Sequence, residues 1–129
     1  MNLLGIDYGT EHIGVALGST ESGLAEPLAT LSSRQSPEGT IQSLVSKHGI
    51  RKIIIGVSEK ISAKQAKQFA DQLKQYANIP IELADETLSS KEAIEKLSHK
   101  SLLKRGTLQH AAAAAVILQR WLDSPVNLA

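Results

Sequence analysis

The chain has 129 residues, of which 42% are hydrophobic and 21% are charged, and its formal charge at pH 7 is +1. This size and composition are typical of one soluble globular domain, so we expect a single domain over residues 1–129. The absence of cysteine excludes disulfides and thiolate metal sites. We find no apolar run long enough to span a bilayer, and the first residues resemble a strand rather than a signal peptide, so we expect a cytoplasmic protein.

The first third of the sequence predicts three strands joined by tight turns. An apolar run covers Leu3–Ile6, a turn follows at Gly9–Glu11, and a second apolar run covers Ile13–Gly18. After a polar loop, Leu24–Leu31 continues as an extended segment, in which Pro27 favours an edge or irregular strand. We therefore expect an antiparallel meander.

The rest of the sequence predicts helices that alternate with strands. Ser36, Pro37 and Glu38 are typical of a helix start, with Ser36 as the cap, and Gly49 is typical of a helix end. The remaining predicted elements are a strand over 51–57, a helix over Ser62–Ala77, a strand over 79–84, a short helix with a capping box of Ser89 and Glu92, and a last helix over about Thr107–Asp123. This order predicts an α/β fold with a mixed sheet and helices on its faces.

The segment "GIDYGT" (Gly5–Thr10) brings a carboxylate, Asp7, into a turn between glycines. Such a turn can hold the phosphates of a nucleotide, or its carboxylate can hold a metal ion that cleaves a phosphodiester. Nucleotide-binding turns of this type belong to ATPases with two large lobes, and this chain is too short for a second lobe. Length therefore favours the metal site.

Three further polar residues are expected near Asp7. Asp85 and Glu86 follow the last predicted strand, and His110 lies in the first turn of the last helix. Oxygen ligands on rigid elements are what Mg²⁺ or Mn²⁺ requires for phosphodiester hydrolysis. Each residue also has a plain structural explanation: Asp7 can form a turn, Asp85 and Glu86 can favour a helix dipole, and His110 can lie on the surface.

A basic segment without acidic residues could hold phosphates, or it could be ordinary solvated surface. Few aromatic side chains are available for base stacking, so we expect salt-dependent recognition of backbone and shape. The basic residues of this segment are Lys96, Lys100, Lys104 and Arg105.

The sequence resembles the YqgF (RuvX) family over about Leu3–Asp123. The resemblance rests on "LLGIDYGTEHIGVALG", "GLAEPLATL", "IIIGV", "FADQL", "IPIELADETLSSKEA" and "AAAAVILQRWLD". It implies an RNase H-like five-stranded mixed sheet with helices on both faces. It also implies a nuclease, described in this family as a Holliday-junction resolvase and as a pre-16S rRNA nuclease.

The resemblance places the family's metal carboxylates on Asp7, Asp85 and Glu86, with Glu86 as the direct ligand, and its last-helix aspartate on His110. Histidine suits Mn²⁺ better than Mg²⁺, or it can carry a proton. The sequence departs from the family pattern at three further places: Glu11-His12 replaces a basic residue, "SEKISAK" replaces a longer loop, and Thr87 replaces an arginine.

Three functions therefore stay open at this point. The first is a nuclease that uses Mg²⁺ or Mn²⁺ and acts on structured RNA or DNA, as a monomer or a homodimer. The second is a nucleic-acid-binding protein of the same fold whose catalytic site has decayed, as the departures would allow. The third is a nucleotide-binding module, which the length disfavours.

Overall fold

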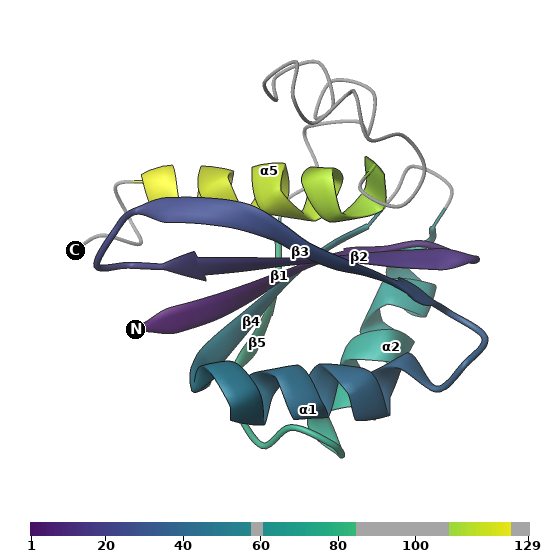
Figure 1. Ribbon diagram of the computed structural model, residues 1–129. Helices are drawn as coiled ribbons and strands as arrows, with labels where there is room; N and C mark the ends of the chain where they lie inside the picture. The colour runs from purple at the N-terminus through teal and green to yellow at the C-terminus, as the bar shows by residue number, and fades with distance from the viewer. Residues whose placement is uncertain (58–60, 85–108, 125–129) are drawn as a thin grey trace.

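A mixed sheet forms the centre of the computed structural model, which describes residues 1–57, 61–84 and 109–124 (Figure 1). The strand order is β3-β2-β1-β4-β5. The first three strands pair antiparallel, whereas β1 with β4 and β4 with β5 pair parallel, as the sequence predicted. The strands are β1 (Asn2–Tyr8), β2 (His12–Ser19), β3 (Leu24–Ser32), β4 (Ile50–Val57) and β5 (Ile81–Leu83).

Helices cover both faces of this sheet (Figure 1). On one face lie α1 (Pro37–His48) and α2 (Ala63–Lys74), and on the other lies α5 (Gln109–Asp123). Among the described residues, no helix is both long enough and apolar enough to cross a membrane. The predicted helix after Ser89 lies outside the described residues.

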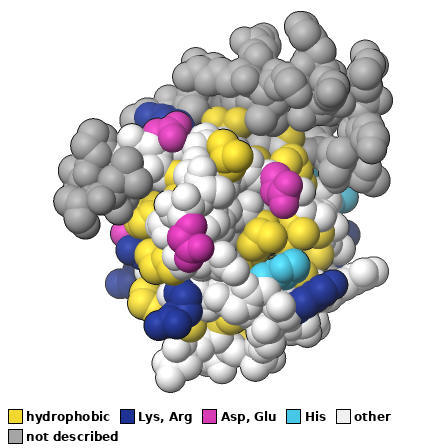
Figure 2. All heavy atoms as spheres, turned by 60° about the vertical axis from the view of Figure 1, so that its left-hand side comes forward, with side chains coloured by type: hydrophobic (Ala, Val, Ile, Leu, Met, Phe, Trp, Pro, Cys, Tyr) yellow, Lys and Arg dark blue, Asp and Glu magenta, His cyan; other side chains and the backbone are white. Residues whose placement is uncertain are grey.

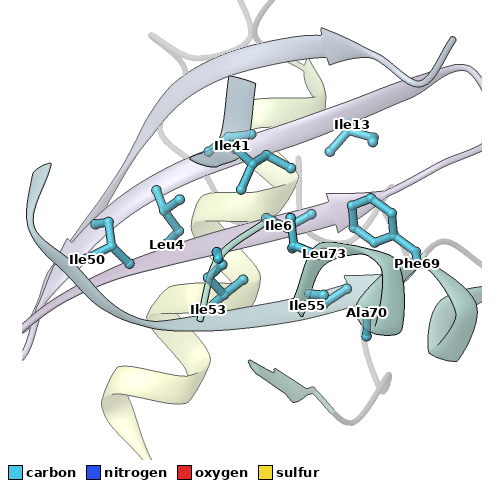
Figure 3. Packing of buried hydrophobic residues seen from close by; sticks show 12 residues of the cluster. Leu4, Ile6, Ile13, Ile41, Ile50, Ile53, Ile55, Phe69, Ala70 and Leu73 are labelled. Carbon is cyan, nitrogen blue, oxygen red and sulfur yellow. The ribbon is translucent and has the colours of Figure 1, made fainter. Parts of the chain in front are cut away.

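The face under α1 and α2 is filled by large aliphatic side chains (Figure 3). Successive residues of a strand point to opposite faces, so every second residue of β1, β2 and β4 contributes to this core. Burying such side chains is worth about 1.5–3 kcal/mol each, so this layer contributes strongly to stability. The fully buried members from the strands and α2 are Leu4, Ile6, Ile13, Val15, Ile53, Ile55 and Leu73.

The face under α5 is built from smaller residues. Leu3, Ala16 and Ile54 of the strands pack against the alanine-rich helix. A Cβ added to Gly5 would lie 2.7 Å from the Cβ of Leu118, so the glycine is what allows the helix to approach. The alanines of α5 and the glycines of the sheet together bring helix and sheet backbones close.

The helix α1 begins at Pro37 as predicted, but the predicted capping role of Ser36 is wrong. Ser36 has φ 49°, in the left-handed region, and its side chain makes no capping hydrogen bond. A capping residue normally has extended backbone angles, from which its oxygen reaches the first N–H groups of the helix. At the other end, Gly49 has φ 60° and its N–H donates to the carbonyl of Val45, as expected for a glycine that ends a helix.

The helix α2 has a capping box in which Ser62 and Gln65 each bind the backbone of the other. It ends at Lys74, three residues before the predicted end at Ala77. The N–H groups of Tyr76 and Ala77 both donate to the carbonyl of Leu73, which closes the helix with a turn. Ala77 is nevertheless buried in the core, so the apolar pattern was right and the helix end was not.

The strand β3 lies at the edge of the sheet, as Pro27 predicted. The register with β2 shifts by one residue at this point, since Val15 pairs with Ala29 and Ala16 pairs with Pro27. Leu28 is thus the extra residue of a bulge. Proline supplies no N–H for a sheet, so an edge strand with a bulge can accommodate it.

Candidate active site

Asp7 lies near the end of β1 and is only 5% exposed. It alternates with Leu3 and Gly5, so its side chain belongs to the face covered by α5. Among the described residues, no other charged or polar residue is so deeply buried. A buried carboxylate needs polar partners, and Asp7 does have an interaction in the structure.

The start of α5 lies directly over the neighbour of Asp7. Gly14 of β2 is the register partner of Asp7. A Cβ added to Gly14 would lie 1.8 Å from the carbonyl oxygen of His110 and 2.8 Å from the amide nitrogen of Ala111. The first turn of α5 therefore rests on the backbone next to Asp7, and the end of β1 and the start of α5 meet at one end of the sheet (Figure 1).

Glycines flank Asp7 on both neighbouring strands. Its partner on β4 is Gly56, where an added Cβ would lie 2.5 Å from Cδ1 of Ile117. Across the paired residues Gly14, Asp7 and Gly56, the carboxylate of Asp7 is therefore the only side chain. The backbone and side chains of α5 lie over the two glycines. The N-terminal end of a helix also favours negative charge nearby, because its N–H groups carry partial positive charge.

His110 is half-buried at the second position of α5, in the first turn as predicted. Desolvation by burial lowers the pKa of His110 from its usual 6.5, and the charge of His12 lowers it further. The imidazole is therefore neutral near pH 7 and can bind a metal ion or accept a proton.

His12 faces His110 across the gap between β2 and α5, a contact that the sequence did not predict. The two ring centres lie 4.9 Å apart, and the ring planes are inclined by 33°. His12 is exposed at the first position of β2 and shares the face of Gly14. The alternation of residues on β2 assigns His12 to the face of Asp7, but nothing in the sequence indicates that residue 110 lies opposite it.

The turn between β1 and β2 is held in place from both sides. The hydroxyl of Ser33 donates to the carbonyl of Gly9 at 2.8 Å, and its N–H donates to the carbonyl of Glu11 at 2.9 Å. On the other side, the ring of Tyr8 stacks on Phe69 of α2 with centres 4.3 Å apart. These contacts fix the backbone that follows Asp7.

The other predicted ligands, Asp85 and Glu86, lie outside the described residues, as do Lys96, Lys100, Lys104 and Arg105. The chain leading to Asp85 is described up to Ala84. Leu83 pairs with Ile55, which pairs with Ile6, and the N–H of Ala84 donates to the carbonyl of Ile55. Since β1, β4 and β5 are parallel, Ala84 reaches the sheet end where Asp7 lies.

The described part of the site provides one carboxylate and imidazole nitrogen. Within residues 1–57, 61–84 and 109–124, no three side chains of His, Cys, Asp or Glu come together as metal ligands. Carboxylate oxygen fits a hard ion such as Mg²⁺, whereas the imidazole of His110 fits an ion of softer character. Asp7 therefore fits the hard ion that the predicted chemistry requires.

Comparison with known proteins gives relatives over nearly the whole chain. The chain is 37% identical to a protein of Syntrophus aciditrophicus named "Putative pre-16S rRNA nuclease", with 96% of this chain and 89% of that protein covered. A protein of Bordetella avium with the same name is 36% identical, with 94% of each chain covered.

Solved structures of resolvases share the fold. The Holliday junction resolvase of fowlpox virus has a TM-score of 0.64 at 14% identity, with 95% of this chain and 99% of that chain covered. RuvC of T. thermophilus in complex with a Holliday junction substrate has a TM-score of 0.53 at 14% identity, with 94% of each chain covered. At these identities the likeness concerns the fold, and it confirms the predicted fold class.

The family comparison covers the segments that hold Asp7 and His110. The family model RuvX, described as "Holliday junction resolvase", matches residues 1–124. This range includes both ends of the candidate site and all the segments on which the predicted resemblance rests. The chain therefore belongs to the RuvX family.

Proposed function

We propose that this protein is a divalent-metal-dependent nuclease that cleaves phosphodiester bonds in structured nucleic acid. The observation that carries the proposal is the burial of Asp7 at the end of β1, beside the first turn of α5. A buried carboxylate must be paired or hydrogen-bonded, and a metal ion is one partner that carboxylate oxygens bind. Family membership and the names of the curated relatives point to the same chemistry.

We propose pre-16S rRNA, processed at its 5′ end, as the substrate. The support is the shared name of the relatives from Syntrophus and Bordetella, which cover nearly the whole chain. Resolution of Holliday junctions is the alternative, and the description of the family supports it. Both substrates are folded polyanions, and both would be met in the cytoplasm, where we place the protein.

In this proposal Asp7 holds Mg²⁺ or Mn²⁺, with Glu86 as a second direct ligand and Asp85 beside it. These residues would hold the ion, and the ion would supply Lewis-acid activation of the phosphate and of the attacking water. His110 is neutral near pH 7 and lies beside Asp7, so it either completes the ligand set or takes up a proton. The basic residues Lys96, Lys100, Lys104 and Arg105 would hold phosphates of the substrate.

Figure 2 shows one side of the molecule, on which no described region is purely basic. That side carries the N-terminus in Figure 1, and acidic and basic side chains are both spread over it. The candidate site lies at the other end of β1. Binding that depends on phosphate contacts would weaken steeply as salt increases.

The test compares the Mn²⁺-dependent cleavage rates of the Asp7→Asn variant and of the wild-type protein. The amide keeps the size of the side chain but removes the charge that holds the ion, so we expect at least a hundredfold loss of Mn²⁺-dependent cleavage. The substrates are a transcript with the pre-16S 5′ leader and a four-way DNA junction, which separates the two candidate activities. Asp71→Asn is the matched control, because Asp71 is exposed on α2.

Wild-type cleavage rates in purified Asp7→Asn would refute the proposed site. Calorimetric titration separates an active enzyme from a protein with a decayed site. Binding of Mn²⁺ at millimolar concentration supports the nuclease. Salt-dependent binding of the substrate without metal binding or cleavage supports the decayed nucleic-acid-binding protein, which the histidine at position 110 favours.

A further inference from the structure

The contact between His12 and His110 joins two elements that are far apart in the sequence. His12 begins β2 and His110 is in the first turn of α5, and their ring centres are 4.9 Å apart. Neither element can move freely, because α5 rests on the backbone of Gly14. The spacing of the two imidazoles is therefore set by the packing of the helix on the sheet.

This spacing is close to that of two imidazoles bound to one ion. With metal–nitrogen distances of about 2.0–2.1 Å and tetrahedral geometry, two imidazole ring centres lie about 5 Å apart. His12 is exposed, so solvent and ions can reach the pair.

We propose that His12 and His110 form a two-imidazole binding site for a divalent ion of the Zn²⁺ class. Water molecules complete its coordination, since the described residues hold no third ligand of the His, Cys, Asp or Glu type close to the pair. Imidazole nitrogen favours Zn²⁺, Co²⁺ or Ni²⁺ over Mg²⁺, so the site discriminates against the ion that carboxylates prefer. This inference extends the proposed nuclease site by naming His12, but the binding of the ion does not depend on cleavage.

An ion in this site would connect β2 with α5. Since the unfolded chain does not hold the two histidines together, the ion stabilises the folded state. The consequence can be measured without any nucleic acid. Zn²⁺ should raise the melting temperature, and Mg²⁺ at the same concentration should not.

The experiment is calorimetric titration of the full chain with Zn²⁺ alone. We expect one ion per chain at this site and at least a tenfold loss of affinity in both His12→Ala and His110→Gln. His48→Ala is the matched control, because His48 lies at the end of α1 on the other face of the sheet, and it should keep wild-type affinity.

A second measurement covers the case of a variant that folds poorly. In wild-type protein, binding of Zn²⁺ should shift the side-chain ¹⁵N resonances of His12 and His110 together. Shifts confined to His48 or His99, or equal affinity in His12→Ala and wild type, would overturn the proposal. Zn²⁺ binding is measured without nucleic acid, so its loss in His12→Ala is read separately from the cleavage that tests the proposed nuclease.

Discussion

On the face covered by α1 and α2, the central strands carry leucine, isoleucine and valine, whereas on the face covered by α5 they carry glycine at positions 5, 14, 18 and 56. The first face gains stability from large side chains that fill the space between sheet and helices. The second face gives up side-chain volume so that a helix can lie close to the strands. The face under α1 and α2 thus contributes stability through large side chains, whereas the face under α5 positions the candidate site through glycines.

The close approach of α5 to the sheet brings the start of this helix next to Asp7. A helix held away by large side chains would leave His110 far from the strand that carries the carboxylate. Glycine at position 14 lets the first turn of α5 come down beside Asp7. The face whose glycines allow the close approach of α5 is thus the one that builds the candidate site.

The largest effect is expected from Gly14→Ala. The new Cβ would lie 1.8 Å from the carbonyl oxygen of His110, a backbone atom that cannot rotate away. The start of α5 would have to leave the sheet, so we expect a loss of more than about 4 kcal/mol in the free energy of unfolding. Urea denaturation followed by circular dichroism measures it.

Gly39→Ala is the control for this substitution. Gly39 lies in α1, and an added Cβ would meet nothing within 4 Å. Alanine there should stabilise the protein by about 0.5–1 kcal/mol, because it favours the helix. Equal stabilities of the two variants would contradict the close approach of α5 to β2.

An effect of about 3–5 kcal/mol is expected from Phe69→Ala on the other face. Phe69 is 3% exposed, and its ring stacks on Tyr8. Its removal leaves a cavity between α2 and the sheet, which thermal denaturation can detect. Tyr76→Ala removes a 46% exposed aromatic ring and should cost about 0.5 kcal/mol or less. Similar losses of stability in Phe69→Ala and Tyr76→Ala would contradict tight packing of the core under α1 and α2.

The smallest effect is expected in the pH dependence of the free energy of unfolding. Burial, and next the charge of His12, lower the pKa of His110 below 6.5 in the folded state. Between the folded pKa of His110 and 6.5, this residue is protonated more in the unfolded chain than in the folded protein. The free energy of unfolding therefore has its full value above pH 6.5 and decreases as the pH falls from 6.5 to the folded pKa. Denaturation at pH 5 to 7.5 should show this decline. His110→Gln should flatten it and His48→Gln should not, and an unchanged slope in His110→Gln would contradict the assignment.

Much of the fold could be predicted because apolar alternation and turn residues are local signals. Pro27 indicated an edge strand, Gly49 ended α1, and the meander was confirmed. The predicted cap at Ser36 failed because Ser36 adopts the left-handed conformation, which is uncommon for a serine before proline and which the sequence does not signal.

The candidate site was predictable only in part. Asp7 could be identified because its segment combines a buried strand with a glycine turn. His12 was missed because its partner lies ninety-eight positions further along the chain and meets it only through the packing of α5 on β2. The sequence also did not indicate that position 14 requires glycine, because the atoms that a side chain there would meet belong to α5. The roles of Asp85 and Glu86 stay predictions.

The bulge at Leu28 and the proline beside it have a consequence for self-association. An edge strand with regular spacing can recruit the same strand of a neighbouring molecule and extend the sheet across an interface. Here the edge of β3 has an irregular spacing and lacks one donor, and the opposite edge, β5, has only three residues. In the part of the chain that the structure describes, neither edge therefore offers a long regular strand, and we expect a second copy on a four-armed substrate to meet the first through helices or loops.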